Sequence, residues 1–183
     1  EEELAKSRPN LKAVFYGAGA TDAFVRPLLA RGVKVLSAWQ ANAIPVAEFC
    51  VAQILLSLKG YFRNSREIHR TGDWQSGKPC IGPGVYGETV ALIGAGAIST
   101  KARELLQAFQ INVVVVPSRP ERRTVSLEEV FQTALVISNH LPNRDDNIGV
   151  LHRGLFASMR PGATFINTGR GAQVDEAGLV EVL

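Results

Sequence analysis

The sequence predicts an α/β protein with a doubly wound parallel sheet. Apolar runs of about four to six residues alternate with segments of helical periodicity, which is the rhythm of strand, helix and strand in such a sheet. One apolar run, at 112–116, is nearly pure valine, as expected for a strand that is covered on both faces. The hydrophobic share of 46% in 183 residues is enough to bury a core.

The first part of the chain is predicted to form one βαβ unit followed by a long helix. The unit consists of a strand, a helix and a strand, at 11–16, 22–31 and 33–37. Residues 44–69 then carry apolar side chains at helical spacing over an unusual length for a compact globule, which predicts a single long helix between two domains. We therefore expect a partial domain in residues 1–41 and a second domain, including the long helix, in residues 42–183.

After a loop rich in Gly and Pro at 71–87, the alternation of strands and helices resumes. The predicted elements in order are strand 89–93, helix 98–109, strand 112–116, helix 126–131, strand 134–138, helix 153–159, strand 164–166 and a helix from 174 to 183. Ser126 and Glu129 stand at capping-box spacing at the start of one of these helices. Because the sequence stops within the last predicted helix, we expect it to be part of a longer chain.

Composition and charge exclude several classes of protein. The 20 Lys and Arg against 17 Asp and Glu leave a net charge of only +3, without a long basic run, so we expect no nucleic-acid partner. Glu48 and Gln53 interrupt the longest apolar stretch, so we expect no membrane-spanning segment. Cys50 and Cys80 have neither the number nor the spacing of a disulfide framework or a metal site. We therefore expect reduced thiols, no bound metal and a cytoplasmic location.

A glycine turn, Gly94-Ala95-Gly96-Ala97-Ile98-Ser99, follows the strand at 89–93 and opens a helix. In this position glycines let the backbone approach a pyrophosphate, and the helix N-terminus offers free N–H groups to the anion. The turn therefore predicts a Rossmann-type dinucleotide site at Gly94, Gly96, Ala97 and Ile98, although Ser99 stands where a third glycine is usual. Packing between strand and helix is the alternative explanation of the same glycines.

The sequence Gly-Ala-Gly-Ala occurs twice in the chain. The earlier copy, Gly17-Ala18-Gly19-Ala20, follows the strand at 11–16. We favour the later copy as the cofactor turn, since its unit continues through a full helix into the valine strand and further strands. The earlier copy can still bind an anion through its amides.

The residues after the valine strand indicate which dinucleotide is bound. NAD-binding units have an acidic side chain at this point for the adenosine ribose, whereas this chain has Ser118 and Arg119. A serine and an arginine suit a 2′-phosphate through charge-assisted hydrogen bonds. NADP is therefore the preferred cofactor and NAD the alternative; the arginines of this segment could also simply solvate a loop.

Arg170 lies just past the strand at 164–166, in the segment Asn167-Thr168-Gly169-Arg170-Gly171. This position predicts a location at the carboxyl edge of the sheet, where open α/β folds bind ligands. A guanidinium there can hold a substrate carboxylate in a bidentate manner and polarise the adjacent carbonyl. A surface ion pair is the alternative role for a single arginine.

Several blocks of the sequence together resemble the D-isomer-specific 2-hydroxyacid dehydrogenases, the family of phosphoglycerate dehydrogenase and the glyoxylate/hydroxypyruvate reductases. The blocks are Leu11-Lys12-Ala13-Val14 with Gly17-Ala18-Gly19-Ala20, Asn42-Ala43 with Val46-Ala47-Glu48, Gly87-Glu88-Thr89-Val90 through Gly96, His140-Leu141-Pro142, Met159-Arg160-Pro161-Gly162-Ala163, Asn167-Thr168-Gly169-Arg170-Gly171 and Val174-Asp175-Glu176. The resemblance covers almost the whole chain.

The resemblance implies a role for each matching site. Arg170 matches the catalytic arginine, which holds the carboxylate and carbonyl of the substrate. Ala18 and Gly19 match a loop whose amides hold the same carboxylate. The remaining matches are to the cofactor: Ala97 and Ile98 at the pyrophosphate, His140 and Pro142 in the block near the cofactor, and Thr168 and Gly169 against the nicotinamide. The resemblance further implies a flavodoxin-like substrate domain, of which part is present, and a homodimer with residues 44–69 in the interface.

The departures from the family pattern are also informative. The family completes its active site with a glutamate and a histidine well beyond the arginine, and the chain ends before either. His69, His140 and His152 are not candidates for that acid/base role. The expected activity is hydride transfer between NAD(P)H and a 2-keto or 2-hydroxy acid; the specific acid is not predicted. A non-catalytic dinucleotide sensor of the corepressor type is the alternative, and S-adenosylmethionine-dependent methyl transfer is disfavoured by the block around Arg170.

Overall fold

The computed structural model describes residues 8–22, 24–73 and 84–183, which separate into two compact units, 1–46 and 47–183. The division lies between Val46 and Ala47, within helix α3 (Trp39–Leu58). Each unit has its own parallel sheet, so the predicted α/β class with parallel sheets is confirmed. Trp74 and Cys80 lie outside the described residues.

The first unit contains a two-stranded parallel sheet and one short helix. Strand β1 (Ala13–Tyr16) pairs with β2 (Lys34–Ser37), and α2 (Val25–Ala30) connects them. The connecting helix is shorter than the predicted 22–31. Its small core contains Leu28 and Val33, which are both 3% exposed, with Leu11, Val14, Phe24 and Val35 packed around them.

The second unit is built on a four-stranded parallel sheet in the order β4-β3-β5-β6. The strands are β3 (Thr89–Ile93), β4 (Asn112–Val116), β5 (Val136–Asn139) and β6 (Thr164–Asn167). Strands β3 and β4 have the predicted bounds, and the other two end one residue later than predicted. Because Ile93 pairs with Val116 and Asn139, and Asn139 with Asn167, all four strands end at one edge.

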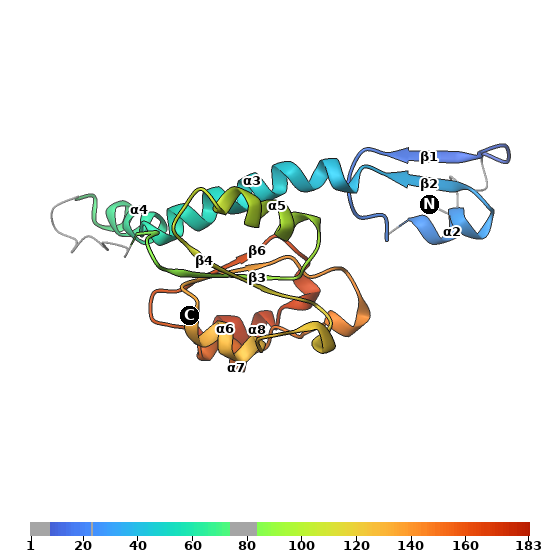
Figure 1. The fold of residues 1–183 in the computed structure, drawn as a ribbon. Coiled ribbons are helices and arrows are strands. Elements are labelled where there is room, and N and C mark those ends of the chain that lie inside the picture. The colour runs from blue at the N-terminus through green and yellow to red at the C-terminus, as the bar shows by residue number, and fades with distance from the viewer. Residues whose placement is uncertain (1–7, 23, 74–83) are drawn as a thin grey trace. The chain divides into compact units, whose positions relative to one another are not determined.

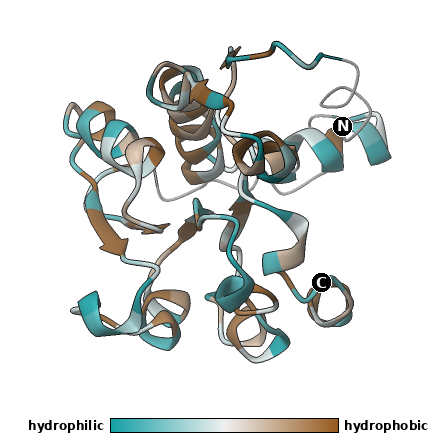
Figure 2. Cartoon of the chain, turned by 90° about the vertical axis from the view of Figure 1, so that its right-hand side faces the viewer, coloured by the Kyte–Doolittle hydropathy of each residue, from teal (hydrophilic) through white to brown (hydrophobic). Residues whose placement is uncertain are grey.

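Helices cover both faces of this sheet, which gives three layers (Figure 1). On one face α3 and α5 (Ala97–Leu106) contribute Ala47, Ile54, Leu58, Ala102 and Leu106, which pack against Val90, Leu92 and Val136. On the other face α6 (Leu127–Thr133), α7 (Arg153–Ala157) and α8 (Glu176–Val182) pack against Ala91, Ile93 and Ile137. Hydrophobic residues accordingly run through the strands, while hydrophilic residues gather on helices and loops outside them (Figure 2).

Strand β4 has both faces covered, as predicted from its valines, although it lies at the edge of the sheet. Val113 and Val115 pack on the α5 side, while Val114 and Val116 pack on the α6 side. Only Val116 is fully buried, because the edge strand has a neighbouring strand on one side alone. The predicted cap of α6 is confirmed, since the Ser126 hydroxyl accepts a hydrogen bond from the Glu129 N–H at 3.0 Å.

The prediction of a single long helix at 44–69 was wrong. Two helices occupy the segment, α3 and α4 (Tyr61–Thr71), with a break at Gly60. Gly60 has φ of +71°, a left-handed conformation that ends a helix and that glycine adopts without a steric cost. The helical periodicity continues across the break, which is why the apolar pattern alone did not reveal it.

Helix α3 is long and apolar enough, by its length and composition, to cross a membrane. Its inward residues Ala47, Cys50, Ile54 and Leu58 are each fully buried in the second unit. A helix in the core of a protein buries its apolar face in the same way. The expectation of no membrane-spanning segment stays a prediction.

Three short 3-10 helices complete the second unit and were not predicted. They are η1 (Pro120–Arg122), η2 (Asp145–Asn147) and η3 (Gly171–Gln173). Each follows the carboxyl end of a strand, β4, β5 or β6. The last predicted helix begins later than expected, because Asp175 caps it by accepting from the Gly178 N–H at 3.0 Å.

Candidate functional site

The turn at the end of β3 requires a glycine at position 94. Gly94 has φ of +107°, a backbone conformation that residues with a Cβ atom rarely adopt. A Cβ atom there would also lie 2.5 Å from the carbonyl oxygen of His140. Gly94 donates to the carbonyl of Val116 at 2.7 Å, so the turn is fixed to the ends of both neighbouring strands.

The next part of the turn leaves room for a ligand at the N-terminus of α5. A Cβ atom on Gly96 would meet nothing within 4 Å, and Gly96 is the exposed N-cap of the helix. The N–H groups of Ala97 and Ile98 belong to the first turn, where the helix itself supplies no acceptor. This arrangement of open backbone and free donors suits a pyrophosphate.

Ser99, in place of a third glycine, is accommodated under the helix. It is 1% exposed, and its Oγ has no hydrogen-bond partner among the described residues. The extra side chain therefore fits the packing between strand and helix and does not block the turn.

The earlier glycine copy is built differently. After β1 the chain passes through Gly17, Ala18 and Gly19, but α2 begins only at Val25, so no helix N-terminus directly follows the turn. A Cβ atom on Gly19 would lie 3.2 Å from Nδ2 of Asn42. Ala18 and Gly19 are half-buried in the first unit, and their predicted contact with the substrate stays a prediction.

The loop after β4 is held by an arginine that the sequence analysis had not singled out. The guanidinium of Arg123 donates from Nε to the carbonyl of Pro117 and from Nη2 to that of Ser118, both at 3.0 Å. Arg119 is exposed and lies 3.8 Å from a carboxylate oxygen of Glu121. Arg123 therefore shapes the loop, while the guanidinium of Arg119 stays at the surface.

A chain of polar side chains lies beneath the ends of β5 and β6. The hydroxyl of Thr168 lies 3.2 Å from Nδ1 of His140 and 3.4 Å from Sγ of Cys50. Burial lowers the pKa of His140 to about 4, so the imidazole is neutral at pH 7. Burial likewise raises the pKa of the Cys50 thiol, a larger effect than the opposing hydrogen bond from Thr168.

Arg170 follows β6 at the same edge of the sheet, and its side chain is exposed. No carboxylate pairs with its guanidinium in residues 8–22, 24–73 and 84–183; the nearest hydrogen bond is a long one, 3.5 Å from Nη1 to the carbonyl of Gly169. The surface ion pair considered as its alternative role is therefore not formed in the described part of the chain.

The structure thus gathers the predicted cofactor residues of the second unit at one edge of its sheet. Gly94 contacts His140, His140 contacts Thr168, and Gly169 adjoins the amide of Asn139. Asn139 and Gln173 were not predicted as site residues, although Asn139, a polar residue directly after the predicted strand 134–138, was a visible signal. Within the described ranges, no group of three or more His, Cys, Asp or Glu could hold a metal ion.

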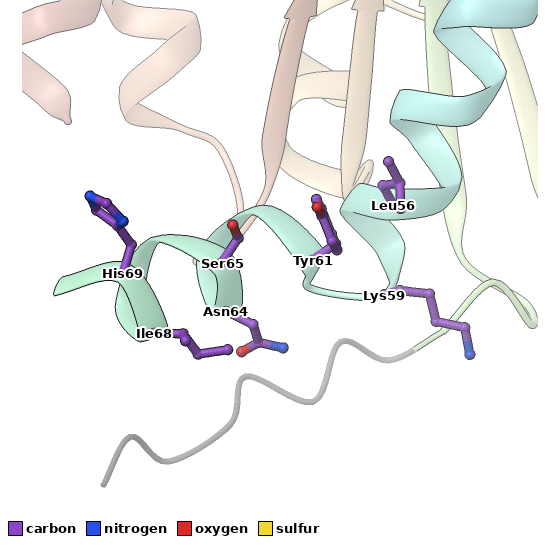
Figure 3. A pocket seen from close by; sticks show the side chains of 7 residues that line it. All are labelled: Leu56, Lys59, Tyr61, Asn64, Ser65, Ile68 and His69. Carbon is purple, nitrogen blue, oxygen red and sulfur yellow. The ribbon is translucent and has the colours of Figure 1, made fainter. Parts of the chain in front are cut away.

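A pocket of about 560 Å³ at the junction of α3 and α4 contains none of the predicted site residues. It is lined by Leu56, Lys59, Tyr61, Asn64, Ser65, Ile68 and His69, which Figure 3 shows around the end of α3 and along α4.

Residues 51–183 match the family described as "D-isomer specific 2-hydroxyacid dehydrogenase, NAD binding domain". Among curated proteins, the chain is 29% identical over 193 residues to D-3-phosphoglycerate dehydrogenase of Archaeoglobus fulgidus, and 28% identical over 185 residues to hydroxypyruvate reductase of Thermotoga maritima. These alignments cover 100% and 98% of the chain but only 36% and 60% of the two relatives. The chain therefore spans less than two thirds of their length.

Two solved structures of enzymes have the same fold as this chain. TP0037 from Treponema pallidum, a D-lactate dehydrogenase, superposes with a TM-score of 0.80 at 25% identity, over 99% of this chain and 57% of that one. An acyclic imino acid reductase, Bsp5, in complex with NADPH and D-Arg, superposes with a TM-score of 0.81 at 26% identity, over 100% of this chain and 61% of that one.

Proposed function

Because the chain belongs to the D-isomer specific 2-hydroxyacid dehydrogenases, we propose that its protein transfers hydride between NAD(P)H and a 2-keto or 2-hydroxy acid. The observation that carries this proposal is Arg170, an exposed guanidinium without a carboxylate partner in the described chain, at the sheet edge that also bears the Gly94 turn.

The dinucleotide is assigned to the edge formed by the ends of β3, β5 and β6. Gly96, Ala97 and Ile98 would hold the pyrophosphate, and His140, Pro142, Thr168 and Gly169 would line the cofactor between β5 and β6. When bound, the nicotinamide supplies the hydride. The neutral imidazole of His140 adds no charge to this site at pH 7, since burial holds its pKa at about 4.

NADP is proposed as the preferred form of the cofactor. The carbonyls of Pro117 and Ser118 are fixed by Arg123, which leaves Arg119 exposed at the end of the valine strand, where the adenosine ribose would lie. Arg119 directly follows Ser118 in the sequence, and a guanidinium and a hydroxyl together complement the charge and the acceptor oxygens of a 2′-phosphate.

Arg170 is proposed to bind the substrate carboxylate through its planar fork and to draw electron density from the adjacent carbonyl oxygen. Ala18 and Gly19 of the first unit would bind the same carboxylate with their backbone amides. Protonation of the carbonyl oxygen is assigned to the histidine, paired with a glutamate, that the family places after the arginine and outside residues 1–183.

The proposed assembly is a homodimer in the cytoplasm. Helix α4 has no buried residue in the described structure and exposes Tyr61 and Phe62, which are 52% and 41% exposed. The free thiol of Cys50 supports a reducing compartment. Nucleic acid and membrane are not proposed as partners.

The test is oxidation of NADPH by glyoxylate, hydroxypyruvate and further 2-keto acids, with the full-length protein and its Arg170→Ala variant. We expect turnover by the wild type, and a loss of kcat/KM of about 100- to 1,000-fold in the variant, because a charged donor to the reacting group is removed. Arg103→Ala, on the exposed surface of α5, is the matched control and should keep its activity.

Cofactor binding without turnover across the whole panel would contradict the enzymatic proposal and favour a dinucleotide sensor. Equal activity of wild type and Arg170→Ala would instead remove the arginine from the reaction.

A further inference from the structure

The loop that carries Arg170 is attached to the neighbouring strand end by two buried amide side chains, Asn139 and Gln173. They are 0% and 2% exposed and lie at the end of β5 and at the end of η3. The amide of Asn139 donates from Nδ2 to Oε1 of Gln173 at 2.7 Å, across a separation of 34 residues. The hydrogen bond between this pair therefore connects two loops that both face the proposed cofactor.

Gln173 uses every hydrogen-bonding position of its amide. Its Nε2 donates to the carbonyls of Leu141 and Pro142 at 2.9 and 3.0 Å. Its Oε1 accepts from Nδ2 of Asn139 and, at 3.3 Å, from the backbone N–H of Arg170. One side chain thus fixes the backbone of Arg170 relative to the His140-Leu141-Pro142 segment.

Both polar atoms of the Asn139 amide also have partners. Its second Nδ2 proton is donated to Oδ1 of Asn167 at 3.0 Å, and its Oδ1 accepts from the N–H of Leu141 at 3.1 Å. Asn167 Oδ1 in turn accepts from the N–H of Gly169 at 3.0 Å. The two buried amides, Asn139 and Gln173, are held rigidly, because rotation of either one leaves a polar group without a partner in a low dielectric.

The network also explains the glycine beside Arg170. A Cβ atom on Gly169 would lie 2.6 Å from Oε1 of Gln173 and 2.8 Å from Nδ2 of Asn139. The two amides therefore pack directly against the Cα of the residue that precedes the arginine.

We propose that Asn139 and Gln173 are positioning residues that set the place of Arg170 relative to the cofactor edge of the sheet. This inference rests on the proposed function, in which Arg170 binds the 2-keto acid. Neither amide touches the substrate; they act through the backbone of residues 169 and 170. Loss of the network shifts the guanidinium and weakens substrate binding.

The experiment compares Gln173→Leu, Asn139→Leu and the double variant in the full-length enzyme, with Gln132→Leu on the exposed side of α6 as the matched control. Each single change leaves buried polar groups unpaired, so we expect a lower Tm and a KM for the 2-keto acid raised about 10-fold or more. In the double variant the Asn139–Gln173 hydrogen bond is lost only once, so the fall in Tm should be smaller than the sum of the two single falls, while KM stays high. The KM for NADPH should change less.

A KM that does not change in any of the three variants, or that rises equally in Gln132→Leu, would overturn the positioning role. A wild type that reduces no 2-keto acid would refute the proposed function separately. In that case amide hydrogen exchange in the segment 164–175 would still test whether the network fixes the backbone. Gln173→Leu should speed exchange there, and unchanged exchange would overturn the inference.

Discussion

The fold changes the acid–base chemistry of His140. It is 8% exposed, its Nε2 has no partner among the described residues, and burial lowers its pKa from 6.5 to about 4. The depressed value means that the folded state resists protonation over a pH range in which the unfolded chain accepts a proton. Its neutral ring at pH 7 is also compatible with the neighbouring Thr168 hydroxyl as donor or acceptor.

This shift predicts a pH dependence of stability. Between pH 6.5 and about 4 the unfolded state binds more protons, so the free energy of unfolding falls as the pH is lowered, by up to about 3 kcal/mol from this residue. His140→Gln should flatten the slope in urea unfolding measured across that range. His69→Gln, exposed on α4, is the control, and an equal slope in wild type and His140→Gln would contradict the assignment.

The proposed preference for NADP over NAD depends on a single side chain, Arg119. Removal of an exposed guanidinium from a 2′-phosphate costs one charge-assisted contact, so Arg119→Ala should weaken NADPH binding by about 10-fold and leave NADH binding unchanged. Fluorescence titration with both cofactors gives the ratio. Arg122→Ala changes an equally exposed arginine on the same loop and should change neither affinity. Unaltered NADPH binding in Arg119→Ala would remove the NADP argument.

At the scale of elements, the carboxyl ends of the strands decide where chemistry is possible. Strand β3 delivers Gly94, β5 delivers Asn139 and His140, and β6 delivers Thr168 and Arg170, all in register at one edge. Parallel strands impose this convergence, because each strand must end at the same side before its connection crosses back. The 3-10 helix η3 ends at Gln173 and places its side chain within hydrogen-bond distance of Asn139 at the end of β5.

Helix α4 has no buried residue in the described chain and exposes the aromatic side chains of Tyr61 and Phe62. If it contributes to the proposed homodimer, Phe62→Glu should weaken dimerisation by about 10-fold or more, because a charge would enter an apolar interface. Sedimentation velocity over a range of concentrations measures this. Arg66→Glu, which is also exposed on α4, changes the helix charge without altering the aromatic pair and is the control. A monomeric wild type, or unchanged dimerisation in Phe62→Glu, would reject the interface.

At the scale of the whole molecule, the two units differ in how far they bury a core. The first unit has a two-stranded sheet whose Phe15 and Leu36 are 81% and 49% exposed. The second has helices on both faces of four strands and buries Ile93, Val116 and Ile137 completely. The proposed cofactor residues lie in the unit with the larger core, which holds its strand ends in fixed register.

The sequence by itself determined the α/β class, the bounds of β3 and β4, the cap at Ser126 and the family. These follow from local periodicity, from one side chain and its near neighbours, or from contiguous motifs, none of which needs the tertiary structure. The helix break at Gly60 was present in the sequence as well, but the uninterrupted apolar spacing concealed it.

Only the tertiary structure decided the rest. Folding brings together the atoms of the Asn139–Gln173 hydrogen bond and of the hydrogen bond from Arg123 to the loop after β4. Folding also removes water from His140, which lowers its pKa. Periodicity assigns a residue to a strand or helix, but it does not state which strand ends meet. Burial and through-space contacts, which set the polarity and geometry of the candidate site, arise only when the sheet is assembled.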